Sequence, residues 1–206
     1  MGLEEVLQSL QAGEPVLVYD SDGREEETDV VIPAEEVGWK DVRFLRNEAG
    51  GLICVAVPND TGERFDLPLL EEKLDFGGSP DYDGRSSFSV SVNHSSTYTG
   101  VTDRDRAKTI GKLAEAVESD ELDFRGEFRS PGHVPILIAA EELLDQRQGH
   151  TELAVKLLKE AGATPAAVVS EMLDDETGEA MTKEKAERYA EKNGLAFVTG
   201  SGVHGL

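Results

Sequence analysis

The sequence predicts one α+β domain spanning residues 1–206, in which helices flank a mixed β-sheet. Segments with apolar residues at helical spacing occur among short apolar or alternating runs that are typical of strands. The 206 residues suffice for one sizeable hydrophobic core. No internal repeat, low-complexity tract or linker divides the chain, so one sheet with helices packed on it is expected.

The first half of the chain predicts a short helix followed by three strands. Apolar residues recur at helical spacing before Gly13, namely Leu3, Val6, Leu7 and Leu10. The further segments are a strand at 15–19, a partly helical segment at 34–48, a buried strand at 52–58 and a strand at 87–93 in which serine alternates with apolar residues. Glycine, proline and aspartate indicate loops at 77–80 and 83–84.

The second half predicts three helices that begin after threonine. Thr102, Thr151 and Thr182 are the expected caps, because a threonine hydroxyl can accept a hydrogen bond from a free N–H at a helix start. The helices should end near Val117, Gly162 and Asn193. The remaining segments are a loop at 128–135, an apolar run at 136–140, a strand at 166–173 and a short strand at 195–199.

The composition limits the classes of partner. With 42 acidic and 20 basic residues, the formal charge is −22, which argues against broad binding to nucleic acid or anionic membranes. The acidic residues are spread along the whole chain, which indicates adaptation to a very salty cytoplasm. The single cysteine, Cys54, excludes an internal disulfide and suits a reducing cytoplasm. No apolar run is long enough to span a membrane.

An acidic stretch around residues 20–29 is the first candidate site. Asp20 to Gly23 has turn composition, and the segment from Arg24 to Asp29 is expected to be extended. In a strand, Glu25, Glu27 and Asp29 would share one face, with Arg24 and Glu26 on the other. Three carboxylates on one face suit a divalent cation or a phosphosugar bound to one. The alternative is a solvated acidic hairpin.

Two histidines further along the chain have chemically useful neighbours. His133 follows Pro131 and Gly132, so it is either an acid, base or ligand on a rigid loop or a surface histidine. His150 immediately precedes a predicted helix. Arg147, Gly149 and Thr151 around it resemble a phosphate cradle, although a simple helix cap with a flanking histidine explains the same residues.

Glu171 and Cys54 lie in apolar strand-like segments. Burial would raise the pKa of the Glu171 carboxyl and suit it to acid–base catalysis, whereas strand alternation could simply point it to solvent. Cys54 is expected to fill the core. His94 and His204 are expected to be structural or superficial.

Seven stretches, at 20–29, 51–54, 88–92, 99–107, 131–134, 147–151 and 171–173, occur in an order that carries a resemblance. Together they resemble 3,4-dihydroxy-2-butanone 4-phosphate synthases, which act on ribulose 5-phosphate in riboflavin biosynthesis. The resemblance covers nearly the whole chain and implies the fold of these synthases, which is related to that of YrdC-like proteins. Residues 24–29 have the archaeal-looking form Arg-Glu-x-Glu-Thr-Asp.

The resemblance implies roles for individual residues. Glu25 and His150 would bind Mg²⁺ or Mn²⁺, with Glu27 supporting a second ion. Glu171 and His133 would be catalytic, with Glu171 favoured for the main proton transfers. The implied substrate contacts are Arg24, Asp29, Arg147, Gly149, Thr151 and, more loosely, Thr109 and Cys54. The resemblance also implies a homodimer with its active site near the subunit interface.

The implied reaction is metal-assisted enolisation, dehydration, rearrangement and loss of carbon 4 as formate. Other interpretations are a different metal-dependent phosphosugar isomerase or lyase, a YrdC-like nucleotide- or RNA-binding module, and a non-catalytic relative. Bacterial members commonly have arginine directly before Pro-Gly-His, where this chain has Ser130, and Glu26 and Thr28 also differ from the bacterial residues. The chain has no room for the GTP cyclohydrolase II domain that is fused in some relatives, so one activity is expected.

Overall fold

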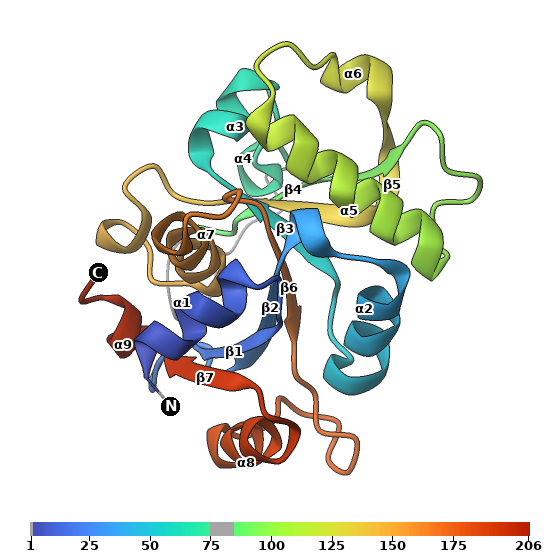
Figure 1. Cartoon of the computed structure of the whole chain (residues 1–206). Coiled ribbons are helices and arrows are strands. Elements are labelled where there is room, and N and C mark those ends of the chain that lie inside the picture. Colours follow the sequence, from blue (N-terminus) through green and yellow to red (C-terminus); the bar gives the residue numbers. More distant parts are fainter. Residues whose placement is uncertain (1, 75–84) are drawn as a thin grey trace.

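The computed structural model describes residues 2–74 and 85–206, and within them seven strands form one mixed sheet (Figure 1). The order across the sheet is β4-β5-β3-β6-β2-β1-β7. β1 pairs with β7 and β3 with β5 in parallel, and the other neighbours are antiparallel. The strands are β1 (Val16–Tyr19), β2 (Thr28–Pro33), β3 (Cys54–Val57), β4 (Phe88–His94), β5 (Phe128–Ile138), β6 (Ala167–Glu171) and β7 (Ala196–Thr199).

Helices cover both faces of the sheet. α1, α7 and α9 lie on one face, and α2 and α5 lie on the other together with α8 (Figure 1). Short helical turns occupy Ala34–Glu36, Leu45–Ala49 and Leu143–Asp145. The α-helices are α1 (Leu3–Gln11), α2 (Trp39–Phe44), α3 (Asn59–Arg64), α4 (Leu70–Leu74), α5 (Asp103–Glu118), α6 (Phe124–Glu127), α7 (His150–Ala161), α8 (Lys183–Asn193) and α9 (Gly200–Val203).

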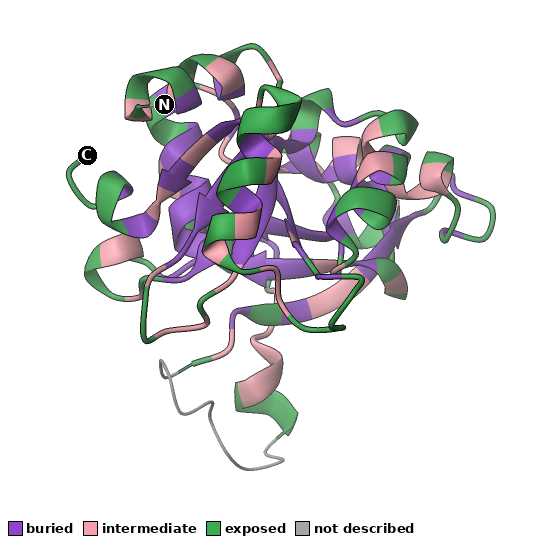
Figure 2. Cartoon of the chain, turned by 90° about the horizontal axis from the view of Figure 1, so that it is seen from below, coloured by how far each residue is buried: buried purple, intermediate pink, exposed green. Residues whose placement is uncertain are grey.

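Two apolar clusters hold these layers together. Successive strand residues face opposite sides, so Val16 and Val18 join the cluster under α1 and α7 while Leu17 joins the one under α5. Both faces of the central strands are therefore buried, as the purple strands of Figure 2 show. Burial on both faces explains why 16–19 and 54–57 are continuous apolar runs.

The predicted fold class is confirmed, and two of the three predicted caps are correct. The Thr102 hydroxyl accepts a hydrogen bond from the Asp105 N–H, and that of Thr182 accepts one from the Lys185 N–H. Thr151 is not a cap: α7 begins one residue earlier, at His150, and its N-cap is Gly149. Gly162 ends α7 in the left-handed conformation, as predicted.

Two further predictions about local structure are wrong. Residues 128–135 are not a loop but most of β5, because they pair with β4 through Asn93 opposite Arg129 and Val92 opposite Val134. The segment from Arg24 to Glu27 is not extended, since β2 begins only at Thr28 and Glu26 has a φ of 58°. The loops predicted at 77–80 and 83–84 lie outside the described residues.

Candidate active site

The turn after β1 is built around the carboxylate of Asp20, which is 1% exposed. Its Oδ2 accepts hydrogen bonds from the Glu25 N–H at 3.0 Å and from Nη1 of Arg24 at 3.1 Å. Its Oδ1 accepts one from the Glu27 N–H at 3.1 Å. Gly23, with a φ of 81°, lets the chain reverse. The turn thereby folds back over Asp20 and presents Arg24, Glu25 and Glu27 to one pocket.

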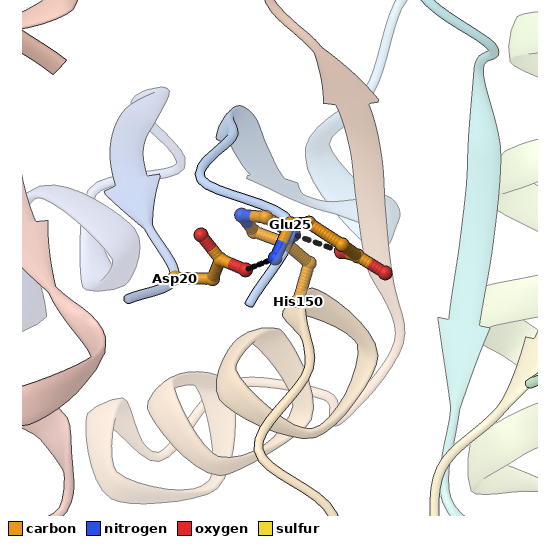
Figure 3. Close-up of side chains that lie close together, drawn as sticks. All are labelled: Asp20, Glu25 and His150. Atoms are coloured by element: carbon orange, nitrogen blue, oxygen red, sulfur yellow. Dashed lines mark hydrogen bonds and ion pairs between the residues drawn. The ribbon is translucent and has the colours of Figure 1, made fainter. Parts of the chain in front are cut away.

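Glu25 meets His150, which is 125 residues further along the chain and is the first residue of α7. Nδ1 of His150 lies 3.3 Å from Oε2 of Glu25, and Nη1 of Arg24 lies 2.8 Å from the same oxygen. Nε2 of His150 lies 3.8 Å from Oδ1 of Asp29. Figure 3 shows Asp20 and Glu25 converging from the N-terminal turn on His150, which rises from the start of α7.

The electrostatics of the pair follow from this packing. Burial favours a higher pKa for Glu25, but the hydrogen bond with His150 and the charge of Arg24 outweigh it and lower the pKa to about 2. Burial favours a lower pKa for His150, but the charge of Asp29 and the contact with Glu25 raise it to about 9. Burial raises the pKa of Asp29 to about 7, against the opposing charge of His150.

These residues open into a pocket of about 320 Å³ at one end of the central strands. Asp29 at the start of β2 lies opposite Glu171 at the end of β6, because the two strands are antiparallel. The Leu52 N–H donates to Oε2 of Glu171 at 2.8 Å. A Cβ at Gly51 would lie 2.3 Å from that oxygen, so glycine is required there. The pocket is lined by Arg24, Glu25, Glu27, Asp29, Arg85, Ser86, Ser87, Phe88, Leu137, Arg147, His150, Thr151, Val169 and Glu171.

Positive groups gather at the α7 side of the pocket. Arg147 and Thr151 line it, and a Cβ at Gly149 would lie 2.0 Å from Nη1 of Arg147 and 2.8 Å from Nη2 of Arg24. Both guanidinium groups therefore approach the backbone at Gly149. The start of α7 adds backbone N–H groups and the positive end of a 12-residue helix. This side of the pocket suits an anion such as phosphate.

Comparisons with known proteins agree with this geometry. A family model described as 3,4-dihydroxy-2-butanone 4-phosphate synthase matches residues 4–204. The protein of that name from Methanosarcina acetivorans is 46% identical, over 98% of this chain and 89% of the relative. The one from Archaeoglobus fulgidus is also 46% identical, over 97% and 91%.

A solved structure of a 3,4-dihydroxy-2-butanone 4-phosphate synthase in complex with two magnesium ions has a TM-score of 0.84 with this chain. It is 29% identical, over 98% of this chain and 94% of the other. The chain belongs to the 3,4-dihydroxy-2-butanone 4-phosphate synthase family. The resemblance drawn from the seven stretches is thereby confirmed.

The donor atoms of this family member suit a divalent cation. Ligand atoms of Asp20, Glu25 and His150 all lie within 4.8 Å of one another. Asp20 already accepts hydrogen bonds from Arg24 and two backbone N–H groups, so Glu25 and His150 are the better ligands. Nε2 of His150 and Oδ1 of Asp29 are buried and have no hydrogen-bond partner among the described residues, and a cation or substrate could satisfy them. Carboxylate and imidazole ligands are compatible with Mg²⁺ and Mn²⁺.

Four residues that the sequence analysis assigned to the site are absent from the pocket lining: Gly149, His133, Thr109 and Cys54. Gly149 borders the pocket, because the guanidinium groups of Arg147 and Arg24 both approach its backbone. His133 is on the exposed part of β5, where its N–H donates to the Asn93 side chain at 2.8 Å. Thr109 is fully buried in α5, and its hydroxyl bonds the His94 N–H and the Asp105 carbonyl. Cys54 is buried in the cluster under α7, where burial raises the pKa of its thiol. The positions of Thr109 and Cys54 agree with a packing role.

Glu171 is half-buried at the end of its strand rather than enclosed within it. The sequence analysis missed the pocket wall formed by Arg85, Ser86, Ser87 and Phe88. It interpreted Asp20 as a turn residue, which is correct, but not as the acceptor that positions Glu25. The only available signal for that role was the position of Asp20 in the acidic stretch.

None of the described helices is long and apolar enough to cross a membrane.

Proposed function

We propose that this chain converts D-ribulose 5-phosphate to L-3,4-dihydroxy-2-butanone 4-phosphate and formate, a lyase reaction of riboflavin biosynthesis. One observation carries the proposal. A single pocket is lined by the Glu25–His150 pair, by Arg147, which precedes α7, and by Glu171. The reaction needs these three capacities together: a metal site, a phosphate site and a proton-transferring group.

Arg147, Thr151 and the start of α7 bind the substrate phosphate in this proposal, with Gly149 allowing close approach to the backbone. They line the pocket or border its positive side. Binding the phosphate away from the reacting carbons fixes the sugar's orientation, which lowers the entropic part of the barrier. Arg24 and Asp29 line the same pocket and would contact the sugar hydroxyls, the role that the family resemblance implies for them.

Glu25 and His150 would hold Mg²⁺ or Mn²⁺, and Glu27, whose pKa is raised by burial and by Glu25 and Glu171, would support a second ion. When bound, the ion would polarise the neighbouring sugar oxygens and so acidify the carbon 3 proton. His150 and Asp29 are both buried, so water screens their charges only weakly.

Glu171 transfers the protons in this proposal. The Leu52 N–H holds its Oε2, so Oε1 is left to take the proton from carbon 3 and return one to the hydroxyl that leaves carbon 1. Asp29, with a pKa of about 7, can hold a proton and donate a hydrogen bond to a sugar hydroxyl. Its place opposite Glu171 in the β2–β6 pair puts both groups on the same substrate.

We infer that a second copy of the chain supplies His133. The residue is absent from the pocket lining of its own chain, and it lies beside the sheet edge formed by β4. Nη2 of Arg129 donates to the Thr97 carbonyl, so the loop after β4 lies beside the same part of β5. That loop exposes Tyr98 by 93% and Val101 by 53%. Exposed apolar residues beside an edge strand favour an interface between copies.

Mixed dimers test this arrangement. Glu171→Gln and His133→Asn homodimers, each inactive, are combined under conditions that allow subunit exchange. If the two residues act across the interface, each mixed dimer has one intact site and activity recovers to about one quarter of wild type. If they act within one chain, no site is intact and activity stays absent. A monomer in sedimentation would also contradict the proposal.

We also propose a cytoplasmic location at high salt. The single buried thiol of Cys54 suits a reducing compartment, and the charge of −22 suits concentrated salt.

NMR with ribulose 5-phosphate labelled at carbon 4 tests the reaction directly. With Mg²⁺ in concentrated KCl, labelled formate should form, and EDTA should abolish it. Substrate consumption without formate would indicate a different phosphosugar isomerase or lyase. No turnover from folded protein would indicate a non-catalytic relative.

A further inference from the structure

Glu152 is a fully buried carboxylate beside the phosphate side of the pocket. It is the third residue of α7 and is 0% exposed. Its Oε1 accepts a hydrogen bond from the Ala140 N–H at 2.9 Å. Its Oε2 pairs with Nη1 of Arg147 at 2.6 Å. The carboxylate thus connects Ala140, two residues after the end of β5, to an arginine that lines the pocket.

The ordinary explanation for glutamate at this helix position is capping. Such a side chain reaches back to the N-cap N–H, or stays in solvent near the positive helix end. Glu152 does neither, because its two oxygens bond Ala140 and Arg147. Removing an ion pair from water is costly, and an apolar residue of similar size often stabilises a fold at least as well. Stability alone therefore gives a weak reason for a charge at this position.

Arg147 is held on several sides. Besides the pair with Glu152, its Nε donates to the Arg85 carbonyl at 3.1 Å. The guanidinium group also crosses Gly149 so closely that a Cβ would lie 2.0 Å from Nη1. The side chain remains 15% exposed and lines the pocket. Within the part of the chain that the structure describes, the protein engages Nη1 and Nε, which leaves Nη2 for a ligand.

A second arginine meets the same glycine. Nη2 of Arg24 would lie 2.8 Å from a Cβ at Gly149. Two guanidinium groups that converge on one residue repel each other, and each has its own buried carboxylate. Nη1 of Arg24 pairs with Asp20, whose side chain is 0% exposed, and Arg147 pairs with Glu152, also 0% exposed. The pairs hold the two cations in place before any anion binds.

We propose that Glu152 is a positioning residue for phosphate recognition: it fixes the guanidinium group of Arg147 so that Nη2 can donate a hydrogen bond to the substrate phosphate. The proposal rests on the function proposed above, in which Arg147 binds that phosphate. Glu152 touches no substrate atom in this account. Glu152 orders the long, flexible side chain of Arg147 in the free protein. The loss of conformational entropy therefore does not have to occur when the ligand binds.

The test compares Glu152→Gln with Glu160→Gln. Both changes remove one negative charge from α7, but Glu160 is exposed and pairs with Lys156 at 2.8 Å. Glutamine has the shape of glutamate and can still accept from Ala140, while the charge that holds Arg147 is lost. Calorimetry measures the dissociation constants for inorganic phosphate and ribulose 5-phosphate. The dissociation constant for Mg²⁺ is measured as the control, because Mg²⁺ binds at a different site.

Glu152→Gln should weaken both phosphate ligands by about tenfold and raise KM with a smaller change in kcat. Mg²⁺ affinity should stay within about twofold of wild type, and Glu160→Gln should change neither. In an Arg147→Ala background, Glu152→Gln should cause no further loss of phosphate affinity. If Glu152→Gln does not fold, Glu152→Asp keeps the charge but withdraws it by one methylene, and the same affinity loss is expected.

A Glu152→Gln protein with a lower Tm and unchanged phosphate affinity would show a purely structural role and overturn the proposal. An equal further loss in the Arg147→Ala background would also overturn it. The binding measurements distinguish a failure of this inference from a failure of the proposed reaction. Wild-type protein that binds ribulose 5-phosphate through Arg147, with an affinity that depends on Glu152, but releases no formate contradicts the reaction alone. Wild-type protein that binds neither phosphate ligand contradicts both.

Discussion

His150 must lose a proton before it can bind a metal ion. With a pKa of about 9, it is an imidazolium at neutral pH and pairs with Glu25, whose pKa is about 2. A metal ligand needs a free nitrogen lone pair, so the proton and the cation compete for the same group. Raising the pH removes the competing proton and therefore favours the cation.

We expect the apparent affinity for Mg²⁺ or Mn²⁺ to increase between pH 7 and the His150 pKa of about 9, and to level off above it. The increase should be about tenfold per pH unit, because one proton is released for each ion bound. Calorimetry in two buffers with different ionisation enthalpies measures both quantities. His204→Asn, which changes an exposed histidine, should show the wild-type profile. An affinity that is constant from pH 7 to 9 would contradict this role for His150.

Glu171→Gln separates proton transfer from binding. Glutamine can still accept from the Leu52 N–H through its oxygen, so the β6 end should keep its shape. The amide cannot exchange a proton, and we expect kcat to fall by about 10²- to 10⁴-fold with little change in substrate affinity. Steady-state kinetics and binding of ribulose 5-phosphate measure the two effects. Glu179→Gln, at an exposed position, is the control. A change in KM alone would mean that Glu171 binds substrate instead.

At the scale of elements, the turn between β1 and β2 depends on one carboxylate. Asp20→Asn keeps the size of the side chain but replaces one acceptor oxygen by an NH₂ group. In place of Oδ2 this group would face the donors of Arg24 and Glu25, and in place of Oδ1 it would face the Glu27 N–H. An unpaired buried donor costs about 1–3 kcal/mol of unfolding free energy. Because Glu25 is presented by this turn, Mg²⁺ affinity should fall as well.

Urea unfolding and calorimetry measure the two effects of Asp20→Asn. Glu26→Gln is the matched change in the same turn, since the exposed Glu26 accepts from the Gly23 N–H and glutamine can do the same. Wild-type Mg²⁺ affinity in a destabilised Asp20→Asn protein would show that the turn does not position Glu25.

Elements set by neighbouring residues could be predicted from the sequence, and those set by distant partners could not. The Thr102 and Thr182 caps are local, as is the Gly162 stop of α7. Residues 128–135 have the composition of a loop but form β5, because β4 pairs with them. Residues 24–27 were predicted to be extended, and this was wrong because the segment turns around Asp20, whose carboxylate accepts hydrogen bonds from two of its N–H groups.

The site shows the same division. Glu25 and His150 were predicted to share a metal through the family resemblance, and the structure brings them to 3.3 Å. Glu152 gave no such signal, since an acidic residue in the first turn of a helix is common. Its bonds to Ala140 and Arg147 exist only once the end of β5 and the start of α7 have met.

At the scale of the whole molecule, the dominant property is the charge of −22. Acidic residues outnumber basic ones by 42 to 20, and they are spread along the chain. The exposed face of α8 carries Glu184, Glu187 and Glu191. Like charges on a compact surface repel one another and destabilise the folded state. Dissolved salt shortens the range of this repulsion from about 10 Å at 0.1 M to about 3 Å at 1 M.

We therefore expect the unfolding midpoint to rise between about 0.1 M and molar KCl, where the screening length contracts about threefold.

A rise alone is ambiguous, because concentrated salt can also strengthen apolar burial. The combined variant Glu184→Gln, Glu187→Gln, Glu191→Gln resolves this, since it removes charge from one exposed face and leaves the apolar core unchanged. If repulsion is the cause, the variant should unfold at a higher temperature than wild type at low salt and gain less from KCl. Thermal unfolding followed by circular dichroism measures both slopes. Equal slopes would assign the salt effect to apolar burial, and a flat wild-type profile would contradict adaptation to a salty cytoplasm.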